Sequence, residues 1–401
     1  MNRGVLLGLS LLLLAGTAGA QGRPRSSAPP PSPPAPAAGQ PLSGLTAAQV
    51  TAFNDGKADF TEIESVADGL GPVFNERSCA ACHLAPSVGG SGRRLVTRFG
   101  TRTNGVFDPL TNLGGSLIQD HAIGFPDGSP HNFVPERVPQ TATIVTRRRT
   151  TPLFGLGLVD ATADSDFIAM AQLQSVRGDG TAGRVNMVDN ISAGIKTAGK
   201  FGWKAQVPTL FQFAGDAYLN EMGITSPEFP NENCPQGNCT ELAFNPQPGL
   251  NDTGDGPRKL RDFMTMLAAP PRGTQNGDTE AGEQAFDRIG CNACHVDTFR
   301  TGNSPIAALS QRTYHPYSDF LLHDMGPLGD GIEQGDAKGQ EIRTAPLWGL
   351  RFTGTYLHDG RTPSLDQAIL AHDGQGRAAR DRFATLDAAT KAKLMAFLRS
   401  L

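Results

Sequence analysis

The pentapeptide Cys-x-x-Cys-His occurs twice in this sequence of 401 residues, at positions 79–83 and 291–295. The pattern is the attachment signature of a c-type haem, whose vinyl groups bind the two thiols as thioethers while the histidine binds the iron. One copy could also be a redox dithiol, but two copies that both end in histidine favour two covalently bound haems. The predicted haem-binding residues are Cys79, Cys82, His83, Cys291, Cys294 and His295, with His83 and His295 as iron ligands.

The composition agrees with domains built around a prosthetic group. The 48 glycines and 30 prolines predict much irregular structure, which suits haem domains because the porphyrin supplies part of the apolar interior. The chain is long enough for two or three domains. Its 35 basic and 39 acidic residues give a formal net charge of -4, so the sequence indicates neither nucleic acid nor an anionic membrane as a partner.

The N-terminus has the three parts of a secretory signal peptide. Arg3 supplies a positive charge, residues 5–14 are apolar, and a small-residue cleavage site ends at Ala20. A membrane anchor is the alternative, but the apolar run is short for a bilayer span. We therefore expect a signal peptide at residues 1–20, no transmembrane span after its cleavage, and a location in the periplasm. Residues 21–42, rich in proline and alanine, are expected to form a disordered linker.

Two of the six cysteines lie outside the haem motifs. Cys234 and Cys239 are separated by a short, turn-rich sequence. In an oxidising compartment such a pair is expected to form a local disulfide. A metal site or a catalytic dithiol is the alternative, but no histidine or further cysteine lies nearby in the sequence.

The order of the motifs indicates that one unit is duplicated. Residues 149–156 match residues 343–350 almost letter for letter, and residues 259–267 resemble residues 393–401. The second pair places Leu, Phe and Leu at i, i+3 and i+7, which is one apolar stripe of a helix. In each copy a haem motif, an Arg-Thr-x-Pro-Leu-like segment and an amphipathic helix follow in the same order.

We therefore predict a mainly α-helical fold of two cytochrome c-like domains with long irregular loops and one insertion. The boundary falls near residue 271, which gives an N-terminal domain of residues 43–271 and a C-terminal domain of residues 272–401. The insertion lies in the first domain, from about residue 183 to residue 251. A helix capped by Thr279 is expected to lead into the second haem motif.

A second ligand for the C-terminal haem is predicted at His372. Ser364 and Gln367 have the spacing of a capping box, so a helix is expected to begin there. Leu365, Ile369 and His372 would then lie on one face of that helix. A histidine on an apolar face is often a buried structural residue, but a chain that must ligate two haems favours ligation.

Two other residues near this haem are alternatives. His358 lies in a turn next to Asp359, to which it is expected to be hydrogen-bonded. It is expected to be structural or to bind a haem propionate, with ligation as the alternative. Met325 lies in a second loop, and a methionine ligand would give a higher potential than a histidine.

The N-terminal haem has fewer candidates for its sixth position. His121 and His131 are the histidines of the first half that could close it, but both lie in loops rich in glycine and proline. The site is therefore expected to be open or weakly closed, with His121, His131 or no residue in that position. An open position suits an enzyme because a substrate such as a peroxide must reach the iron.

Cleavage of a peroxide also needs a group that moves protons. Asp160, which follows the first Arg-Thr-x-Pro-Leu segment, is the predicted acid/base, and Arg149 is predicted to bind a propionate or to stabilise charge. An ordinary solvated or salt-bridged role is the alternative for both. Trp203 and Trp348 are the two tryptophans, and either could relay electrons between the haems, with core packing as the alternative.

The chain resembles the di-haem oxidoreductase family of peroxidase-like proteins, whose members are also labelled thiol oxidoreductases. The resemblance runs from about residue 42 to the C-terminus. More distantly, the chain is similar to the bacterial di-haem cytochrome c peroxidases and to their tryptophylquinone-forming relatives. The matching stretches are residues 71–83, 152–158, 201–205, 220–225, 323–326, 343–350, 358–361 and 368–372.

The resemblance implies a peroxidatic N-terminal haem, bound by His83, and an electron-transferring C-terminal haem, bound by His295. In the peroxidases a methionine follows a His-x-Gly turn. His372 occupies the similar place here, which implies bis-histidine ligation and a lower potential. The peroxidases also bind calcium, partly through a Thr-x-Pro stretch that Thr344 and Pro346 resemble.

The expected function is the reduction of hydrogen peroxide with electrons from a small redox protein, such as a cytochrome c or a cupredoxin. Two alternatives stay open. One is an electron carrier in which both haems are six-coordinate and no substrate reaches iron. The other is a di-haem oxidase that acts on a protein side chain, a thiol or an organic substrate.

Overall fold

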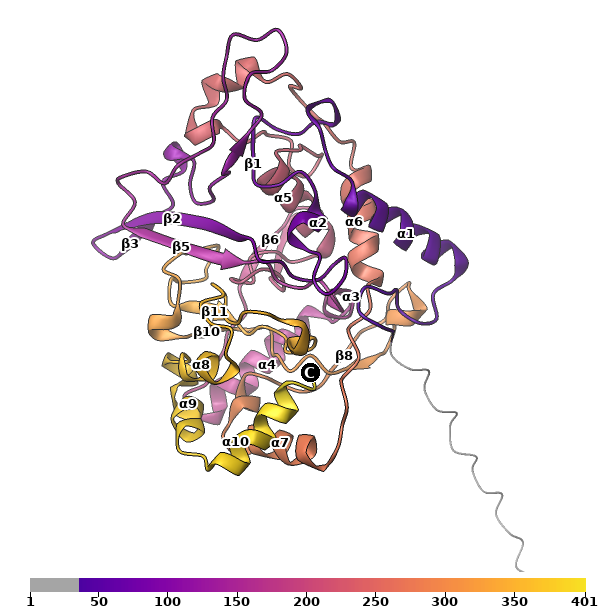
Figure 1. Cartoon of the computed structure of the whole chain (residues 1–401), viewed down its shortest axis with the longest axis vertical. Helices are drawn as coiled ribbons and strands as arrows, with labels where there is room; N and C mark the ends of the chain where they lie inside the picture. The colour runs from indigo at the N-terminus through magenta and orange to yellow at the C-terminus, as the bar shows by residue number, and fades with distance from the viewer. Residues whose placement is uncertain (1–35) are drawn as a thin grey trace, which may run out of the picture. The chain divides into compact units, whose positions relative to one another are not determined.

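The structure is a computed structural model that describes residues 36–401 (Figure 1). The predicted signal peptide, residues 1–20, lies outside the described residues. So do residues 21–35, the larger part of the predicted linker.

The end of the predicted linker, residues 36–42, belongs to the folded unit instead. The Leu42 N–H donates to Met266 O over 2.8 Å, and the Ala268 N–H donates to Gln40 O over 3.0 Å. These hydrogen bonds hold the segment against the end of a helix, so the expectation of disorder is wrong for these residues.

The described chain is mainly helical, with short strands and long irregular connections, as the sequence predicts (Figure 1). The helices are α1 (Ala47–Thr61), α2 (Cys79–Cys82), α3 (Leu156–Asp160), α4 (Asp164–Arg177), α5 (Leu210–Met222), α6 (Asp255–Met266), α7 (Gly277–Arg288), α8 (Leu365–Leu370), α9 (Arg377–Ala384) and α10 (Ala388–Leu398). The strands are β1 (Val73–Phe74), β2 (Leu95–Thr103), β3 (Val106–Asp108), β4 (His121–Ala122), β5 (Ile144–Arg149), β6 (Met187–Asn190), β7 (Ile195–Ala198), β8 (Phe299–Arg300), β9 (Thr313–Tyr314), β10 (Leu322–Asp324) and β11 (Glu341–Arg343).

The strands form small antiparallel sheets. Their orders are β1-β4, β3-β2-β5, β6-β7, β8-β9 and β10-β11. Within residues 36–401, no helix is both long enough and apolar enough to cross a membrane.

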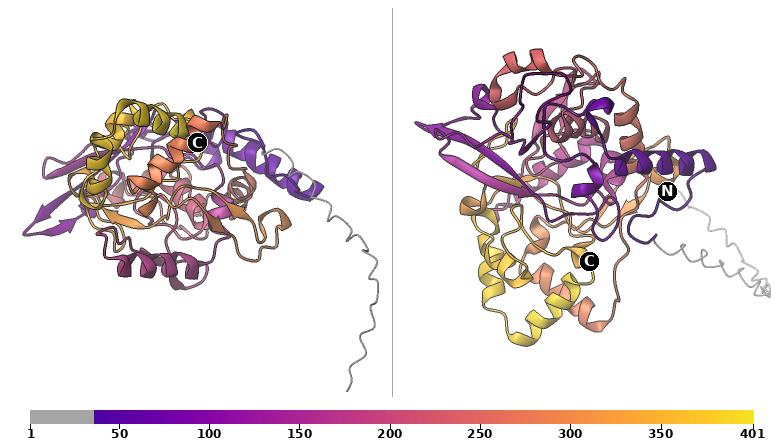
Figure 2. Two further views of the ribbon diagram at one scale, coloured as in Figure 1. Left: turned by 90° about the horizontal axis from the view of Figure 1, so that it is seen from below. Right: turned by 45° about the horizontal axis from the view of Figure 1, so that its top comes forward.

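Two helix pairs make the predicted duplication visible in the fold. α1 packs against α6, and α7 packs against α10 (Figure 1 and Figure 2). A Cβ atom added at Gly56 of α1 would lie 2.1 Å from the Lys259 carbonyl oxygen of α6. A Cβ atom added at Gly282 of α7 would lie 2.0 Å from the Lys393 carbonyl oxygen of α10. Because Lys259 and Lys393 are equivalent positions of the repeated helix, both pairs cross at the same place, and only glycine fits there.

The repeated Arg-Thr-x-Pro-Leu segments also make equivalent contacts. Gly155 and Gly349 end the two segments with φ angles of +73° and +75°. The Gly155 N–H donates to Leu267 O, and the Gly349 N–H donates to Leu401 O, each over 3.1 Å. Each segment therefore binds the end of the closing helix of its own copy.

The start of α7 differs slightly from the prediction. Asn276, not Thr279, is the N-cap, and its side chain accepts from the Asp278 and Thr279 N–H groups. Thr279 completes the capping box by accepting from the Asn276 N–H over 2.8 Å. The helix therefore begins earlier than expected because an asparagine caps at least as well as a threonine.

The hydrophobic core crosses the predicted domain boundary. One buried cluster combines Phe263 of the first half with Phe299 and Tyr314 of the second half. A second cluster around Phe286 and Phe397 comes from the second half alone. The described residues accordingly form one compact unit, and a separation near residue 271 is not seen.

The segment predicted to be an insertion, residues 183–251, is integral to the first core. It contains α5, which buries Leu210, Ala214 and Tyr218 in that cluster. The same segment contains the predicted disulfide between Cys234 and Cys239, which is confirmed.

A buried ion triad joins the two halves of the chain. The Asp330 carboxylate accepts from Arg148 Nε over 2.7 Å and lies 2.9 Å from Lys204 Nζ. The side chains of Lys204 and Asp330 are completely buried, and that of Arg148 is nearly so. One carboxylate thus compensates two buried cations, which would otherwise be costly to remove from water.

We expect Asp330→Ala to lower the free energy of unfolding by about 3–5 kcal/mol, because two buried cations lose their counter-charge. Urea unfolding of the haem-loaded protein, followed by circular dichroism, measures the change. The control is Asp189→Ala, which breaks an exposed pair with Lys196 and should cost less than about 1 kcal/mol. Equal small losses in both variants would contradict the role of the triad.

Candidate functional site

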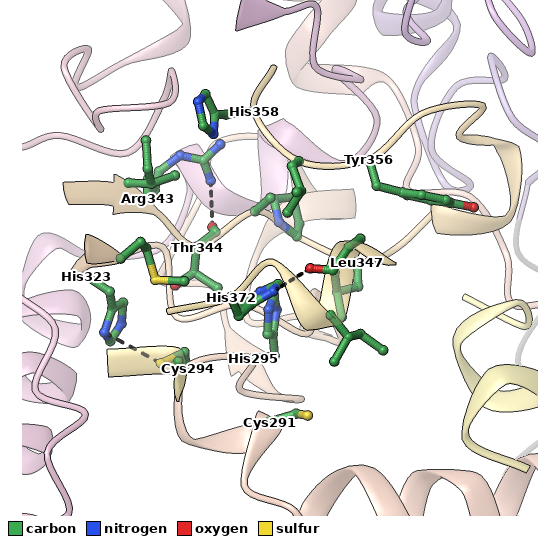
Figure 3. A pocket seen from close by; sticks show the side chains of 18 of the residues that line it. Cys291, Cys294, His295, His323, Arg343, Thr344, Leu347, Tyr356, His358 and His372 are labelled. Carbon is green, nitrogen blue, oxygen red and sulfur yellow. Dashed lines mark hydrogen bonds between the residues drawn. The ribbon is translucent and has the colours of Figure 1, made fainter. Parts of the chain in front are cut away.

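Each Cys-x-x-Cys-His motif lines its own cavity. The larger cavity has a volume of about 340 Å³, and the smaller one has a volume of about 180 Å³. In Figure 3 the second motif projects into the larger cavity from one side. The motif residues that line the two cavities are Cys291, Cys294 and His295 in the larger one and Cys79, Cys82 and His83 in the smaller one. The structure therefore brings together the residues that were predicted to hold each haem.

His295 and His372 lie close together in the larger cavity (Figure 3). The Nδ1 atom of His295 lies 2.8 Å from Tyr317 O, and the Nδ1 atom of His372 lies 2.8 Å from Ala368 O. A carbonyl oxygen only accepts, so both Nδ1 atoms carry the proton and both Nε2 atoms keep a lone pair for a metal. Burial lowers the pKa of His295 to about 4 and also lowers the pKa of His372, so both rings are neutral near pH 7.

The predicted helix before His372 is confirmed. Ser364 caps α8 by accepting from the Gln367 N–H over 3.3 Å. The helix ends at Leu370, so His372 lies directly after it rather than within it. Leu365 and Ile369, predicted to share its face, also line the larger cavity.

His358 and Met325, the other candidate ligands, also line this cavity. His358 is buried, with its ring edge against Trp203 at 6.2 Å between centroids. Its expected hydrogen bond to Asp359 is not present, because the Asp359 carboxylate accepts from Arg361 Nε over 2.7 Å instead. His372 is the better ligand candidate because its Nδ1–H is already fixed by a backbone carbonyl.

His323 is held by protein groups at both ring nitrogens. Its Nε2 lies 2.8 Å from the Asp319 carboxylate, and its Nδ1 lies 2.6 Å from Gln375 Oε1 and 3.5 Å from Cys294 Sγ. Burial lowers the pKa of His323, but the charge and hydrogen bond of Asp319 outweigh it and hold the pKa well above the usual value. His323 therefore contacts Cys294 of the attachment motif, and neither of its ring nitrogens is free to bind iron.

The stretch that resembles a calcium-binding segment lies in the wall of the larger cavity. The Thr344 carbonyl oxygen accepts from Ser318 Oγ over 2.7 Å and from Arg343 Nη1 over 3.2 Å. Because the positively charged Arg343 guanidinium donates to this carbonyl oxygen, the structure gives no support for a bound cation at Thr344 and Pro346. Calcium stays a prediction.

The smaller cavity contains a single histidine. All eight histidines lie within residues 36–401, and only His83 lines this cavity. Its Nδ1 lies 3.1 Å from Gly90 O, which again leaves Nε2 free. Burial lowers the pKa of His83 to about 4, so the ring is neutral.

His121 and His131 do not reach either cavity. His121 is half-exposed, stacks on Phe74 and pairs with Asp120 over 2.9 Å. His131 stacks on Phe244 and pairs with a glutamate. Besides His83, no histidine of the described residues lines the smaller cavity, although Met222 and Met264 do. An open site at the first haem stays a prediction.

Three arginines in the smaller cavity have buried nitrogen atoms without a hydrogen-bond partner among the described residues. These atoms are Nε of Arg98, Nη2 of Arg148 and Nε of Arg149. Unsatisfied buried donors with positive charge suit an anionic ligand. A haem brings two propionates, so the donor set fits this group.

Two carboxylic acids of α5 also line the smaller cavity. Phe213, Ala217 and Glu221 lie at i, i+4 and i+8 and share one face of the helix, with Asp216 beside them. Burial raises the pKa of Glu221, although the hydrogen bond from Asn75 Nδ2 (2.8 Å) opposes this shift. Burial also raises the pKa of Asp216. Both acids can therefore hold a proton nearer to neutral pH than an exposed carboxyl group can.

Asp160, the predicted acid/base, lines neither cavity. It lies at the end of α3, where the Leu210 N–H donates to its carboxylate, and burial raises its pKa to about 6. It follows the repeated segment in sequence, but α3 directs it toward Lys200 instead of a haem motif. Glu221 is the carboxylate that sequence reasoning missed, and the i, i+4, i+8 spacing on α5 is the signal that could have found it.

Arg149 and Trp203 lie where the two cavities meet. Both residues, with Phe213, line both cavities. Trp203 Nε1–H donates to Arg149 O over 3.0 Å, and Arg149 Nη1 donates to Thr355 O over 2.7 Å. Trp348 lines only the larger cavity. Of the two tryptophans, Trp203 therefore has the position expected of a relay.

The chain was compared with protein families, with curated proteins and with solved structures. The family model described as "Di-haem oxidoreductase, putative peroxidase" matches residues 127–401, which is more than half of the chain and begins after the first haem motif. A search of curated proteins found no significant match.

Among solved structures the chain is similar to hydrazine synthase from Kuenenia stuttgartiensis (12% identity, TM-score 0.41, covering 98% of this chain and 100% of that one). It is also similar to a MauG-like protein associated with microbial copper homeostasis (13% identity, TM-score 0.39, covering 94% and 95%). A third similar structure is the di-haem peroxidase BthA from Burkholderia thailandensis (14% identity, TM-score 0.39, covering 88% and 86%). Likenesses this distant carry no argument about function. The family match, which covers more than half of the chain, does: this chain belongs to the di-haem oxidoreductase family, whose description implies two haem groups.

Proposed function

We propose that the protein is an exported c-type di-haem peroxidase, which reduces hydrogen peroxide with electrons from a small redox protein. The observation that carries the proposal is the difference between the two cavities. The larger cavity offers His295 and His372, whose Nδ1 atoms are fixed and whose Nε2 atoms are free. The smaller one offers one histidine and two buried carboxylic acids, with Met222 and Met264 also in its wall. Two nitrogen ligands suit electron transfer, while one ligand with an acid/base nearby suits substrate chemistry.

The residues that would hold the haems follow from the same geometry. The cysteines of each motif would form the thioethers, His83 would bind iron in the smaller cavity, and His295 with His372 would bind iron in the larger one. When bound, the haems supply iron centres that accept and deliver electrons. The unpartnered arginine nitrogens of the smaller cavity would bind the propionates.

Glu221 is the group we propose as the acid/base. Reduction of one hydrogen peroxide molecule to two waters consumes two electrons and two protons, and the O–O bond breaks more easily when the departing oxygen receives a proton. Among the described residues, none donates a hydrogen bond to Glu221 Oε1, and Glu221 lines the smaller cavity, so this oxygen is available to exchange a proton. Asp216 is less free, because Asn220 Nδ2 donates to its carboxylate within the same helix.

Electrons would enter at the larger cavity and pass to the smaller one. Trp203 lines both cavities, and its indole is hydrogen-bonded to the backbone of Arg149, which also lines both. A cytochrome c or a cupredoxin is the expected type of donor, because each carries one electron at a time and works in the same compartment.

Export to the periplasm is part of the proposal. It is supported by the signal-peptide pattern of residues 1–20 and by the disulfide between Cys234 and Cys239, since such bonds persist in oxidising compartments.

The test of this function is the optical and EPR spectrum of the periplasmically expressed protein, oxidised and half-reduced, with and without cyanide and peroxide. We expect one low-spin haem and one haem that binds cyanide, with oxidation of a reduced donor when peroxide is added. Two low-spin haems that bind neither cyanide nor peroxide in either redox state would instead identify an electron carrier. Oxidation of a thiol or an organic substrate without peroxide turnover would identify an oxidase.

We expect Glu221→Gln to slow the reaction with peroxide by about 10²-fold or more, because the proton acceptor is lost. The wild-type rate should fall as the pH decreases through the raised pKa of Glu221, since protonation removes the base form, and this fall should be absent in the variant. Stopped-flow absorbance of the haem measures both effects. Asp216→Asn is the matched control, and a larger loss in that variant would transfer the role to Asp216.

We expect His372→Ala to convert the C-terminal haem from low-spin to high-spin and to make it bind cyanide, because its second ligand is removed. EPR spectroscopy of the oxidised protein measures the change. His358→Ala removes the other buried histidine of the same cavity and should leave the low-spin signal intact. The reverse pattern would make His358 the ligand.

We expect Trp203→Phe to slow electron transfer between the haems several-fold while leaving both haem spectra unchanged. Rapid reduction of the C-terminal haem, followed by absorbance at the N-terminal haem, gives the rate. Trp348→Phe is the control because Trp348 lines the larger cavity alone. Equal rates in both variants would exclude Trp203 as a relay.

A further inference from the structure

Asn75 connects Glu221 to the surface of the protein. Asn75 as a whole is only 2% exposed. Asn75 Nδ2 donates to Glu221 Oε2 over 2.8 Å, and Asn75 Oδ1 accepts from the Asp120 N–H over 3.3 Å. The backbone of the same segment is fixed to α5, because the Asn75 and Glu76 N–H groups both donate to Glu221 O, over 2.7 Å and 3.2 Å.

These hydrogen bonds decide which oxygen of Glu221 can carry a proton. The Asp120 N–H can only donate, so the Asn75 atom that it contacts must be the amide oxygen. The NH₂ group of Asn75 therefore faces Glu221. An amide NH₂ group only donates, and Oε2 is therefore held as an acceptor. The proton of the acid form is therefore favoured on Oε1, and Glu221 lines the smaller cavity.

Glu76, the next residue, lines the smaller cavity and also reaches solvent. Its side chain is 30% exposed, and its carboxylate lies 2.9 Å from Arg94 Nη1. Arg94 also pairs with Asp120, which in turn pairs with His121 over 2.9 Å; both of these side chains are about half-exposed. A carboxylate that touches both water and the cavity can pass protons between them.

We propose that Asn75 and Glu76 form the proton inlet of the first haem site. Glu76 takes protons from solvent, and Asn75 is a positioning residue that keeps Glu221 Oε1 directed into the cavity to receive them. This inference rests on the proposed role of Glu221, and it goes further by naming the route and the residues that supply its proton.

The charges around Glu221 fix the expected direction of its titration. Arg98 on β2 and Arg94 in the preceding loop are the facing cations, and Asp216 on α5 is the facing anion. Burial raises the pKa of Glu221, while the Asn75 hydrogen bond lowers it. Removing the Asn75 amide must therefore raise this pKa further, so the base form of Glu221 is lost at a higher pH than in the wild type.

The first experiment compares haem-loaded Asn75→Leu with Gln119→Leu. Gln119 is a matched control, since it is a buried amide that donates to the backbone oxygen of Asn220, next to Glu221, over 3.1 Å. The pH profiles of peroxide reaction and of cyanide binding to the ferric haem are measured for both. We expect the acid limb of both profiles to move to higher pH in Asn75→Leu alone, with a rate about tenfold lower on that limb.

Asn75→Asp provides a second variant of nearly the same volume, in case Asn75→Leu does not load haem. It replaces the donor with a carboxylate and should move the profile in the same direction. If the profiles of the Asn75 variants match those of wild type or Gln119→Leu, the positioning role is overturned.

The second experiment uses Glu76→Gln, which keeps an acceptor for Arg94 but cannot titrate. We expect a slower peroxide reaction with a larger solvent deuterium isotope effect, and partial recovery as the concentration of a small carboxylic acid buffer is raised. A wild-type rate with a wild-type isotope effect would exclude Glu76 as the inlet.

Cyanide binding separates this inference from the proposed function. If the protein does not turn over peroxide but the cyanide profile shifts as expected in the Asn75 variants, the peroxidase proposal fails and the inlet stands. If peroxide is turned over but neither profile responds to these residues, the inlet fails and the peroxidase proposal stands.

Discussion

One hydrogen bond from Nδ1–H to a backbone carbonyl sets the direction of each proposed iron ligand. His83 uses Gly90 O, His295 uses Tyr317 O, and His372 uses Ala368 O. Because a neutral imidazole has one ring proton, fixing it at Nδ1 leaves the lone pair on Nε2, and burial keeps each ring neutral. The backbone carbonyls therefore determine which ring nitrogen of each histidine is available to bind iron.

The two copies share this arrangement but complete it differently. Each has a glycine-mediated helix crossing and an Arg-Thr-x-Pro-Leu segment bound to the closing helix. In the second copy, α8 ends beside the cavity and delivers His372. In the first copy, α5 occupies the cavity wall and delivers Glu221 and Asp216. One scaffold thus carries a cavity with two candidate nitrogen ligands and a cavity with one candidate histidine ligand and two acids, which is the physical basis for proposing different roles for them.

Local features were predictable from the sequence, and long-range packing was not. The haem motifs, the cap at Ser364 and the Cys234–Cys239 disulfide depend on residues close together in the chain, and the structure contains each of them. Asp160 lies outside both cavities and Glu221 lines one, because proximity in sequence to a repeated segment does not determine which side of a helix faces a cavity. The domain boundary near residue 271 stays a prediction, although Phe299 and Tyr314 join a core formed by residues far earlier in the chain.

The shared core also limits how this duplicated chain can evolve. Phe299, Tyr314 and Trp348 of the second copy complete an apolar interior whose other side belongs to the first copy. An independent cytochrome unit would have to cover these aromatic surfaces with residues of its own, and neither copy does so. Loss or exchange of one copy by recombination would expose the interior of the other to water. The two cavities therefore depend on one shared core, and a change in that core is expected to affect both of them.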